Sequence, residues 1–200
     1  MEEKNYSGNM IVIEGADAAG TSTQAQKIAE KLDCFYTAEH TDKKVGRKVD
    51  EMIKEGDYLP ETIALGFACD RMIHIEEDVI PKLEKGETVV MDRYYHSSLV
   101  YQDLLGADHT WIKELHRKAV KPDITIVLDI DLDTVVERLK KRDGLNNNIF
   151  EKKKFQGKVI EKYRELEEKL EEEIIYVDAD GTIEQVFDRI MEKIEEKDLL

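Results

Sequence analysis

The sequence has 200 residues, of which 41% are hydrophobic and 38% are charged, and its formal net charge is −15. This apolar content excludes a disordered or low-complexity chain, and the acidic balance argues against a nucleic-acid partner, because phosphate neutralisation needs an excess of cations. The segment 1–5 lacks an apolar stretch, and no apolar run approaches the ~18–20 residues that span a bilayer. We therefore expect one cytoplasmic domain over residues 1–200, with no membrane partner.

Short apolar runs alternate with longer helical patterns along the chain. The runs are rich in β-branched residues and do not alternate with polar residues, as in parallel strands that are covered on both faces. They lie at 10–13, 34–36, 88–91, 124–128 and 174–177. The segments between them, such as 21–32 and 132–142, suit crossover helices. The sequence thus predicts an α/β fold, a doubly wound five-stranded parallel sheet with helices on both faces.

Residues 15–22 follow the first run with the glycine and serine spacing of a phosphate-binding loop, but Thr21 stands where that loop carries a lysine. Gly15 and Gly20 can adopt positive φ angles, and the helix that begins near Thr21 directs its dipole at an anion. We therefore favour an ATP phosphate site over an ordinary strand-to-helix turn. The residues assigned to this site are Gly15, Ala16, Asp17, Ala18, Ala19, Gly20, Thr21, Ser22 and Thr23.

The missing lysine leaves two possibilities, because either another cation replaces it or the loop binds phosphate without catalysis. Residues 138–154 contain seven Lys and Arg residues against two carboxylates, and the segment 143–148 between them has a turn composition. This pattern is typical of a short mobile lid, at about 138–150, that closes over polyphosphate. The alternative is a solvated helix end.

A second motif follows the third apolar run. Asp92 lies directly after that run, at the carboxyl edge of the expected sheet, where ligands bind in open α/β folds. Asp92 is suited to hold Mg²⁺ and Arg93 to bind a phosphate. The alternative is a local ion pair between the two residues.

With these motifs the sequence resembles thymidylate kinases, which are nucleoside-monophosphate kinases of the phosphate-loop type. The resemblance covers nearly the whole chain and rests on residues 14–24, 67–71, 92–102 and 121–123, with Tyr163. It implies a homodimeric enzyme that uses ATP and Mg²⁺ to phosphorylate dTMP. Two alternatives stay open: a kinase for dUMP, UMP or a deoxynucleoside, and a catalytically weak nucleotide-binding protein.

The resemblance also implies roles for single residues. Phe67 would stack on the base, Arg71 would hydrogen-bond it, and Tyr101 would pack against the sugar. Asp17 would contact the sugar hydroxyl and the reaction centre, and Arg93 would hold the acceptor phosphate. The implied substrate site is Asp17, Glu39, Phe67, Arg71, Arg93, Ser97, Ser98, Tyr101 and Gln102. The implied catalytic residues are Asp17, Arg93, Arg138 and Arg142, and the implied Mg²⁺ ligands are Ser22 and Asp92.

Besides Thr21, one position and one segment depart from the family's pattern. Ala18 stands where some members carry an arginine, so a catalytic arginine must come from the lid. Residues 40–44 replace a segment that usually contains Arg, Pro and Gly, which leaves Lys43, Lys44 or Arg47 to supply a second cation for the acceptor phosphate. Cys69 is expected to be a small buried residue.

Overall fold

The computed structural model describes residues 6–143, 149–170, 172–197 and 199. Five parallel strands within these residues form a sheet in the order β2-β3-β1-β4-β5. The strands are β1 (Met10–Gly15), β2 (Phe35–Ala38), β3 (Val89–Asp92), β4 (Ile124–Asp129) and β5 (Ile174–Asp178). The predicted doubly wound α/β fold is confirmed.

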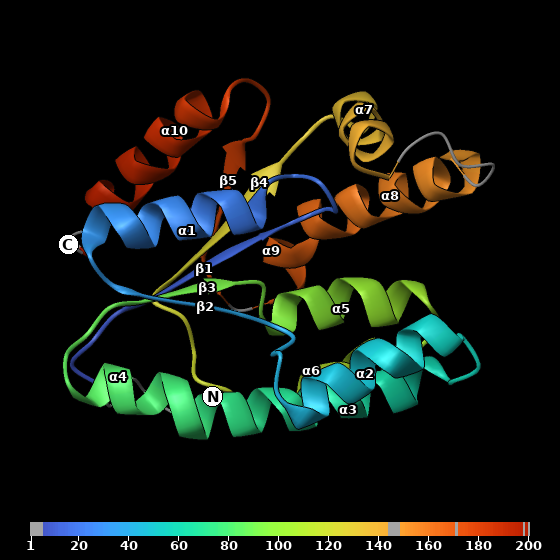
Figure 1. The fold of residues 1–200 in the computed structure, drawn as a ribbon, viewed down its shortest axis with the longest axis horizontal. Coiled ribbons are helices and arrows are strands. Elements are labelled where there is room, and N and C mark those ends of the chain that lie inside the picture. Colours follow the sequence, from blue (N-terminus) through green and yellow to red (C-terminus); the bar gives the residue numbers. More distant parts are fainter. Residues whose placement is uncertain (1–5, 144–148, 171, 198, 200) are drawn as a thin grey trace.

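Helices cover both faces of the sheet (Figure 1). On one face α1 (Thr21–Leu32) packs against α10 (Ile183–Glu196), and on the other α3 (Pro60–His74) packs against α5 (Tyr95–Leu104). The other helices described are α2 (Lys44–Glu55), the π-helical turn η1 (Ile75–Val79), α4 (Ile80–Glu84), α6 (His109–Leu115), α7 (Leu132–Asp143), α8 (Ile149–Arg164) and α9 (Leu166–Lys169).

The central strand β1 carries the core of the sheet. Every residue of β1 is buried, and the strand pairs with β3 on one side and β4 on the other. Its run of Ile11, Val12 and Ile13 therefore contacts protein on both faces, which explains why this strand has no polar alternation. The parallel strands direct their carboxyl ends to one edge, so the turns after β1, β2 and β3 meet there.

The starts of α1 and α10 differ in how their backbone N–H groups are satisfied. Thr182 and Gln185 form a capping box at the start of α10, with bonds of 3.3 and 2.9 Å. At the start of α1, Gly20 has a φ of 106° and no side chain to cap the helix. The first turn of α1 thus directs N–H groups toward the sheet edge without a side-chain cap, as an anion site requires.

The turn between β2 and α2 is fastened to α3. The backbone N–H of Thr41 donates to Asp70 Oδ2 at 2.7 Å, and the Thr41 hydroxyl donates to Oδ1 at 2.7 Å. A Cβ atom at Gly46 would lie 2.0 Å from the Thr41 carbonyl oxygen, so only glycine permits this approach of α2. The turn and the start of α2 are therefore held in one arrangement against α3.

No helix in the described ranges is both long and apolar enough to cross a membrane. The expected lid at 138–150 lies partly outside the described residues, because residues 144–148 are not among them.

Candidate active site

A cavity of about 690 Å³ opens at the carboxyl edge of the sheet. Its walls come from the loop after β1, the turn after β2, helices α2 and α3, the turn after β3, and helices α5 and α8. The cavity brings together all the residues that sequence analysis assigned to the substrate and Mg²⁺ sites: Asp17, Ser22, Glu39, Phe67, Arg71, Asp92, Arg93, Ser97, Ser98, Tyr101 and Gln102.

The loop at 15–22 has the positive φ angles that the sequence predicted, at Gly15 (157°) and Gly20 (106°), and Ala18 also has a positive φ (64°). Arg138 of α7 fixes this loop from behind. Its Nη1 donates to the carbonyl oxygens of Ala18 at 3.3 Å and Ala19 at 3.0 Å, and its Nη2 donates to that of Ala179 at 3.1 Å. Arg138 thus contacts the backbone of the loop and is not among the residues that line the cavity.

Ser22 and Asp92 meet at the base of the loop. The Ser22 hydroxyl donates to Asp92 Oδ2 at 2.5 Å, whereas Asp92 Oδ1 is buried and has no hydrogen-bond partner in the described part of the chain. A hydroxyl beside an unpaired carboxylate oxygen is a suitable donor set for Mg²⁺, which takes few protein ligands and keeps water and phosphate oxygens. The two residues therefore fit the expected metal site.

Asp17 and Arg93 form an ion pair in the wall of the cavity. Arg93 Nη2 lies 3.2 Å from Asp17 Oδ1, so Arg93 pairs with the loop carboxylate and not with its neighbour Asp92. Tyr101 OH also donates to Asp17 Oδ1, at 2.9 Å, and Gln156 Nε2 donates to Oδ2 at 2.8 Å. Burial raises the pKa of Tyr101 above its usual value, and the neighbouring Asp17 acts in the same direction, so the phenol stays a donor.

Glu14 links the loop to the Arg93 segment, a role that sequence analysis missed. This fully buried carboxylate accepts from Tyr94 N at 2.7 Å, Ser97 N at 3.1 Å, Ser97 Oγ at 2.7 Å and Tyr163 OH at 2.8 Å. Arg93 Nη1 in turn donates to Ser97 Oγ at 3.2 Å. A carboxylate that ends an apolar strand was the signal for this contact, because a buried charge needs several partners.

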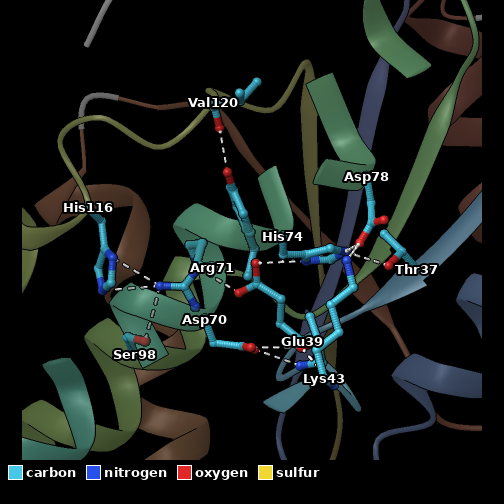
Figure 2. A network of polar contacts seen from close by, with 12 residues as sticks. Thr37, Glu39, Lys43, Asp70, Arg71, His74, Asp78, Ser98, His116 and Val120 are labelled. Carbon is cyan, nitrogen blue, oxygen red and sulfur yellow. Dashed lines mark hydrogen bonds and ion pairs between the residues drawn. The ribbon is translucent and has the colours of Figure 1, made fainter. Parts of the chain in front are cut away.

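Arg71 lies in a buried network on the opposite wall (Figure 2). Its Nε donates to Glu39 Oε2 at 2.6 Å, and the side chains of Arg71 and Glu39 are only 3% and 4% exposed. Its Nη1 lies 3.5 Å from Ser98 Oγ and 3.0 Å from His116 Nδ1, and its guanidinium carbon is 5.3 Å from the ring centre of Tyr94. Asp70, which precedes Arg71 in the chain, is also buried but binds Thr41 and not Arg71.

The expected cation after Glu39 is not found at the cavity. None of Lys43, Lys44 and Arg47 is among the described residues that line it. Lys43 Nζ instead pairs with Asp78 at 2.6 Å. His40 occupies this part of the wall, with its ring centre 5.6 Å from that of Phe67.

The face of α3 explains one wrong expectation. Phe67 and Arg71 are four residues apart, so both project from the same side of the helix and line the cavity. Cys69, between them, projects from the other side and is exposed, contrary to the buried position expected for it.

Arg142, the other expected lid cation, lies in the last turn of α7 and is exposed. It follows Arg138 by four residues and shares a face of α7 with it. The segment 144–148 that should carry the tip of the lid is outside the described residues.

Residues 13–190 match the family model for thymidylate kinase. The chain is similar to the probable thymidylate kinase of Methanocaldococcus jannaschii, with 39% identity over 183 residues that cover 90% of this chain and 93% of the relative. It is also similar to the probable thymidylate kinases of Methanococcus maripaludis (39% identity; 94% and 95% covered) and Thermococcus kodakarensis (37% identity; 92% and 96% covered).

Proposed function

Because the chain belongs to the thymidylate kinase family, we propose that it is an ATP-dependent nucleoside-monophosphate kinase that transfers the γ-phosphoryl group of ATP to dTMP, giving ADP and dTDP. The observation that carries this function is one cavity that Asp17 and Ser22, from the phosphate loop and the start of α1, line together with Arg71 of α3. The family match favours dTMP over the other acceptors and over a non-catalytic protein.

The loop after β1 would bind the phosphates of ATP. Its backbone N–H groups and the start of α1 supply hydrogen bonds and a dipole for an anion. Ser22 and Asp92 would hold Mg²⁺, and the ion when bound would neutralise charge on the phosphates. Arg138 would keep the loop in shape by occupying the carbonyl groups of Ala18 and Ala19, so that the N–H groups stay directed at the ligand.

The other half of the cavity would bind dTMP. Phe67, Arg71 and Tyr101 all line the cavity. Phe67 would present an aromatic face to the base, Arg71 would donate hydrogen bonds to its edge, and Tyr101 would pack against the sugar. Arg93 would bind the acceptor phosphate, held in place by Asp17 and Ser97. The phosphate oxygen is already anionic and needs no general base, so positioning and charge stabilisation are what the protein must supply.

Arg142 would supply positive charge to the transferring phosphoryl group when the lid closes. It would replace the lysine of the phosphate loop, whose position is occupied by Thr21. Its replacement by alanine should reduce kcat far more than dTMP affinity.

We further propose a cytoplasmic homodimer. Leu59 and Leu65, at the start and middle of α3, are exposed apolar side chains that do not line the cavity. Their burial against a second copy would remove apolar surface from water. Light scattering coupled to size-exclusion chromatography tests this state, and a mass near 23.2 kDa would contradict it.

The function is tested by measuring ADP formation from ATP and Mg²⁺ with dTMP, dUMP, UMP, dCMP, dGMP or no acceptor. We expect turnover to depend strongly on dTMP. Turnover with another acceptor would move the base assignment while keeping the mechanism. Nucleotide binding without turnover would identify a non-catalytic protein, and Thr21→Lys would then test whether the missing lysine is the cause.

A further inference from the structure

His116 lies directly behind Arg71 although the two residues are 45 positions apart. Arg71 Nη1 is 3.0 Å from Nδ1 and 3.2 Å from Nε2 of the imidazole. His116 is 5% exposed, and its ring stacks on Tyr95 with centres 6.2 Å apart. His116 is not among the described residues that line the cavity, so a bound nucleotide would contact Arg71 and not His116.

The protonation state of His116 follows from this contact. A guanidinium only donates hydrogen bonds, so one of the two imidazole nitrogens near Nη1 must be unprotonated to accept one, and the neutral ring provides one such nitrogen. Burial lowers the pKa of His116 to about 2, and the charge of Arg71 and the neighbouring His96 act in the same direction. The ring is therefore a neutral acceptor at physiological pH.

Three contacts leave the guanidinium of Arg71 little freedom to rotate. Glu39 accepts a hydrogen bond from Nε on one side, and His116 and Ser98 lie within hydrogen-bond distance of Nη1 on the other side (Figure 2). Tyr94 lies against its face at 5.3 Å. The Ser98 contact is long at 3.5 Å, so His116 is the closer partner of Nη1.

Glu39, the partner of Arg71 Nε, also has contacts of its own. His74 Nδ1 lies 3.4 Å from Glu39 Oε1, and its Nε2 lies 2.6 Å from Thr37 Oγ1. Glu39 thus has its own support from α3 and β2. Removal of His116 would free the Nη1 side of Arg71 while the Glu39 side stays held.

We propose that His116 is a positioning residue for base selection, which holds the free N–H donors of Arg71 toward the base of the acceptor nucleotide. The proposal rests on the proposed function. A donor-only edge suits a pyrimidine that presents a carbonyl group there, as thymine does, and disfavours one that presents an amino group, as cytosine does.

The test compares His116→Phe, which keeps a buried ring but removes the acceptor, with His116→Asn, which keeps a side-chain carbonyl. Loss of a hydrogen bond to a charged group predicts that His116→Phe raises the Kd and KM for dTMP roughly 10-fold or more. We expect kcat at saturating dTMP and the KM for ATP to stay within about twofold, and the preference for dTMP over dCMP to narrow. His116→Asn should recover most of the dTMP affinity.

His109→Phe is the matched control, because His109 begins helix α6, which ends just before His116, and it contacts Asp103, not Arg71. It should leave dTMP affinity unchanged. The proposal is overturned if His116→Phe binds dTMP like the wild type, or if the Phe and Asn variants lose affinity equally. Should His116→Phe fail to fold, His116→Leu takes its place in the same comparison.

The dTMP Kd is measured by calorimetry without ATP. A wild type that binds dTMP but does not turn it over would therefore contradict the proposed kinase activity while leaving the His116 comparison readable.

Discussion

The two halves of the cavity are built in opposite ways. The half that we propose for ATP relies on backbone, with a glycine-bearing loop and an uncapped helix start. The half that we propose for dTMP relies on the buried pair of Arg71 and Glu39, whose side chains are 3% and 4% exposed. Asp17, where the two halves meet, has a side chain that is 41% exposed. Polyphosphate is common to all nucleoside triphosphates and needs little selection, whereas a base is distinguished only by donors and acceptors that cannot rearrange.

Glu39→Ala should have the largest effect, because it leaves the Arg71 charge buried without its partner. We expect the free energy of unfolding to fall by about 3–5 kcal/mol, as measured by urea denaturation. Glu114→Ala removes an exposed pair, with Arg117 at 2.6 Å, and should change stability little. Equal losses of unfolding free energy in the two variants would contradict the view that the buried Arg71–Glu39 pair matters more for stability than the exposed Glu114–Arg117 pair.

Arg93→Ala tests the point at which the two halves meet. Removal of this cation, which we propose to bind the acceptor phosphate, should lower kcat/KM for dTMP about 100- to 1,000-fold, since the lost interaction would stabilise charge during transfer. Arg164→Ala, which breaks a pair with Asp129 outside the cavity, is the control and should leave kcat/KM unchanged. A loss smaller than about tenfold for Arg93→Ala would remove Arg93 from the transfer step.

Acid should weaken the dTMP wall through His116. Its pKa of about 2 lies below the unfolded value of 6.5, so between these limits only the unfolded chain takes up a proton at this residue. Stability from His116 is complete above pH 6.5 and falls as the pH is lowered. From pH 6.5 to 5 the wild type should lose roughly 2 kcal/mol more than His116→Asn. Parallel pH profiles from denaturation would show that the imidazole does not stay neutral.

Arg138→Ala should have a smaller effect, confined to the ATP half. Without its bonds to the carbonyl groups of Ala18 and Ala19 the loop loses support, and we expect the KM for ATP to rise about tenfold with the KM for dTMP unchanged. Arg189→Ala is the matched control, because Arg189 donates to the carbonyl groups of Asp178 and Asp180 in the neighbouring turn. An equal rise in the KM for ATP in Arg189→Ala would show that the effect comes from the turn at 178–180 and not from the loop at 15–22.

The sequence was sufficient to predict the sheet and the loop because both depend on local patterns. The β-branched run at 10–13 and the glycine spacing after it lie within 13 residues, and the structure places both where they were expected. The dTMP wall depended on the family resemblance, since Phe67, Arg71 and Ser98 have no local pattern that assigns them to one cavity.

Glu14, Gln156 and His116 were missed because their partners are remote in the chain. Gln156 contacts Asp17 across 139 residues, and His116 contacts Arg71 across 45. Only Glu14 had a sequence signal, as a carboxylate at the end of an apolar strand. The ion pair of Lys43 with Asp78, on the turn η1, was not predicted for the same reason.

The turn between β2 and α2 has a consequence for the entropy of binding. Thr41 lies outside any helix or strand, yet its amide and its hydroxyl both donate hydrogen bonds to the Asp70 carboxylate. Its amide hydrogen should therefore exchange with solvent as slowly as those of neighbouring helices, both with and without dTMP. The backbone of this turn is already ordered in the folded protein. A nucleotide that binds against Glu39 and His40 would therefore lose little conformational entropy by ordering the turn.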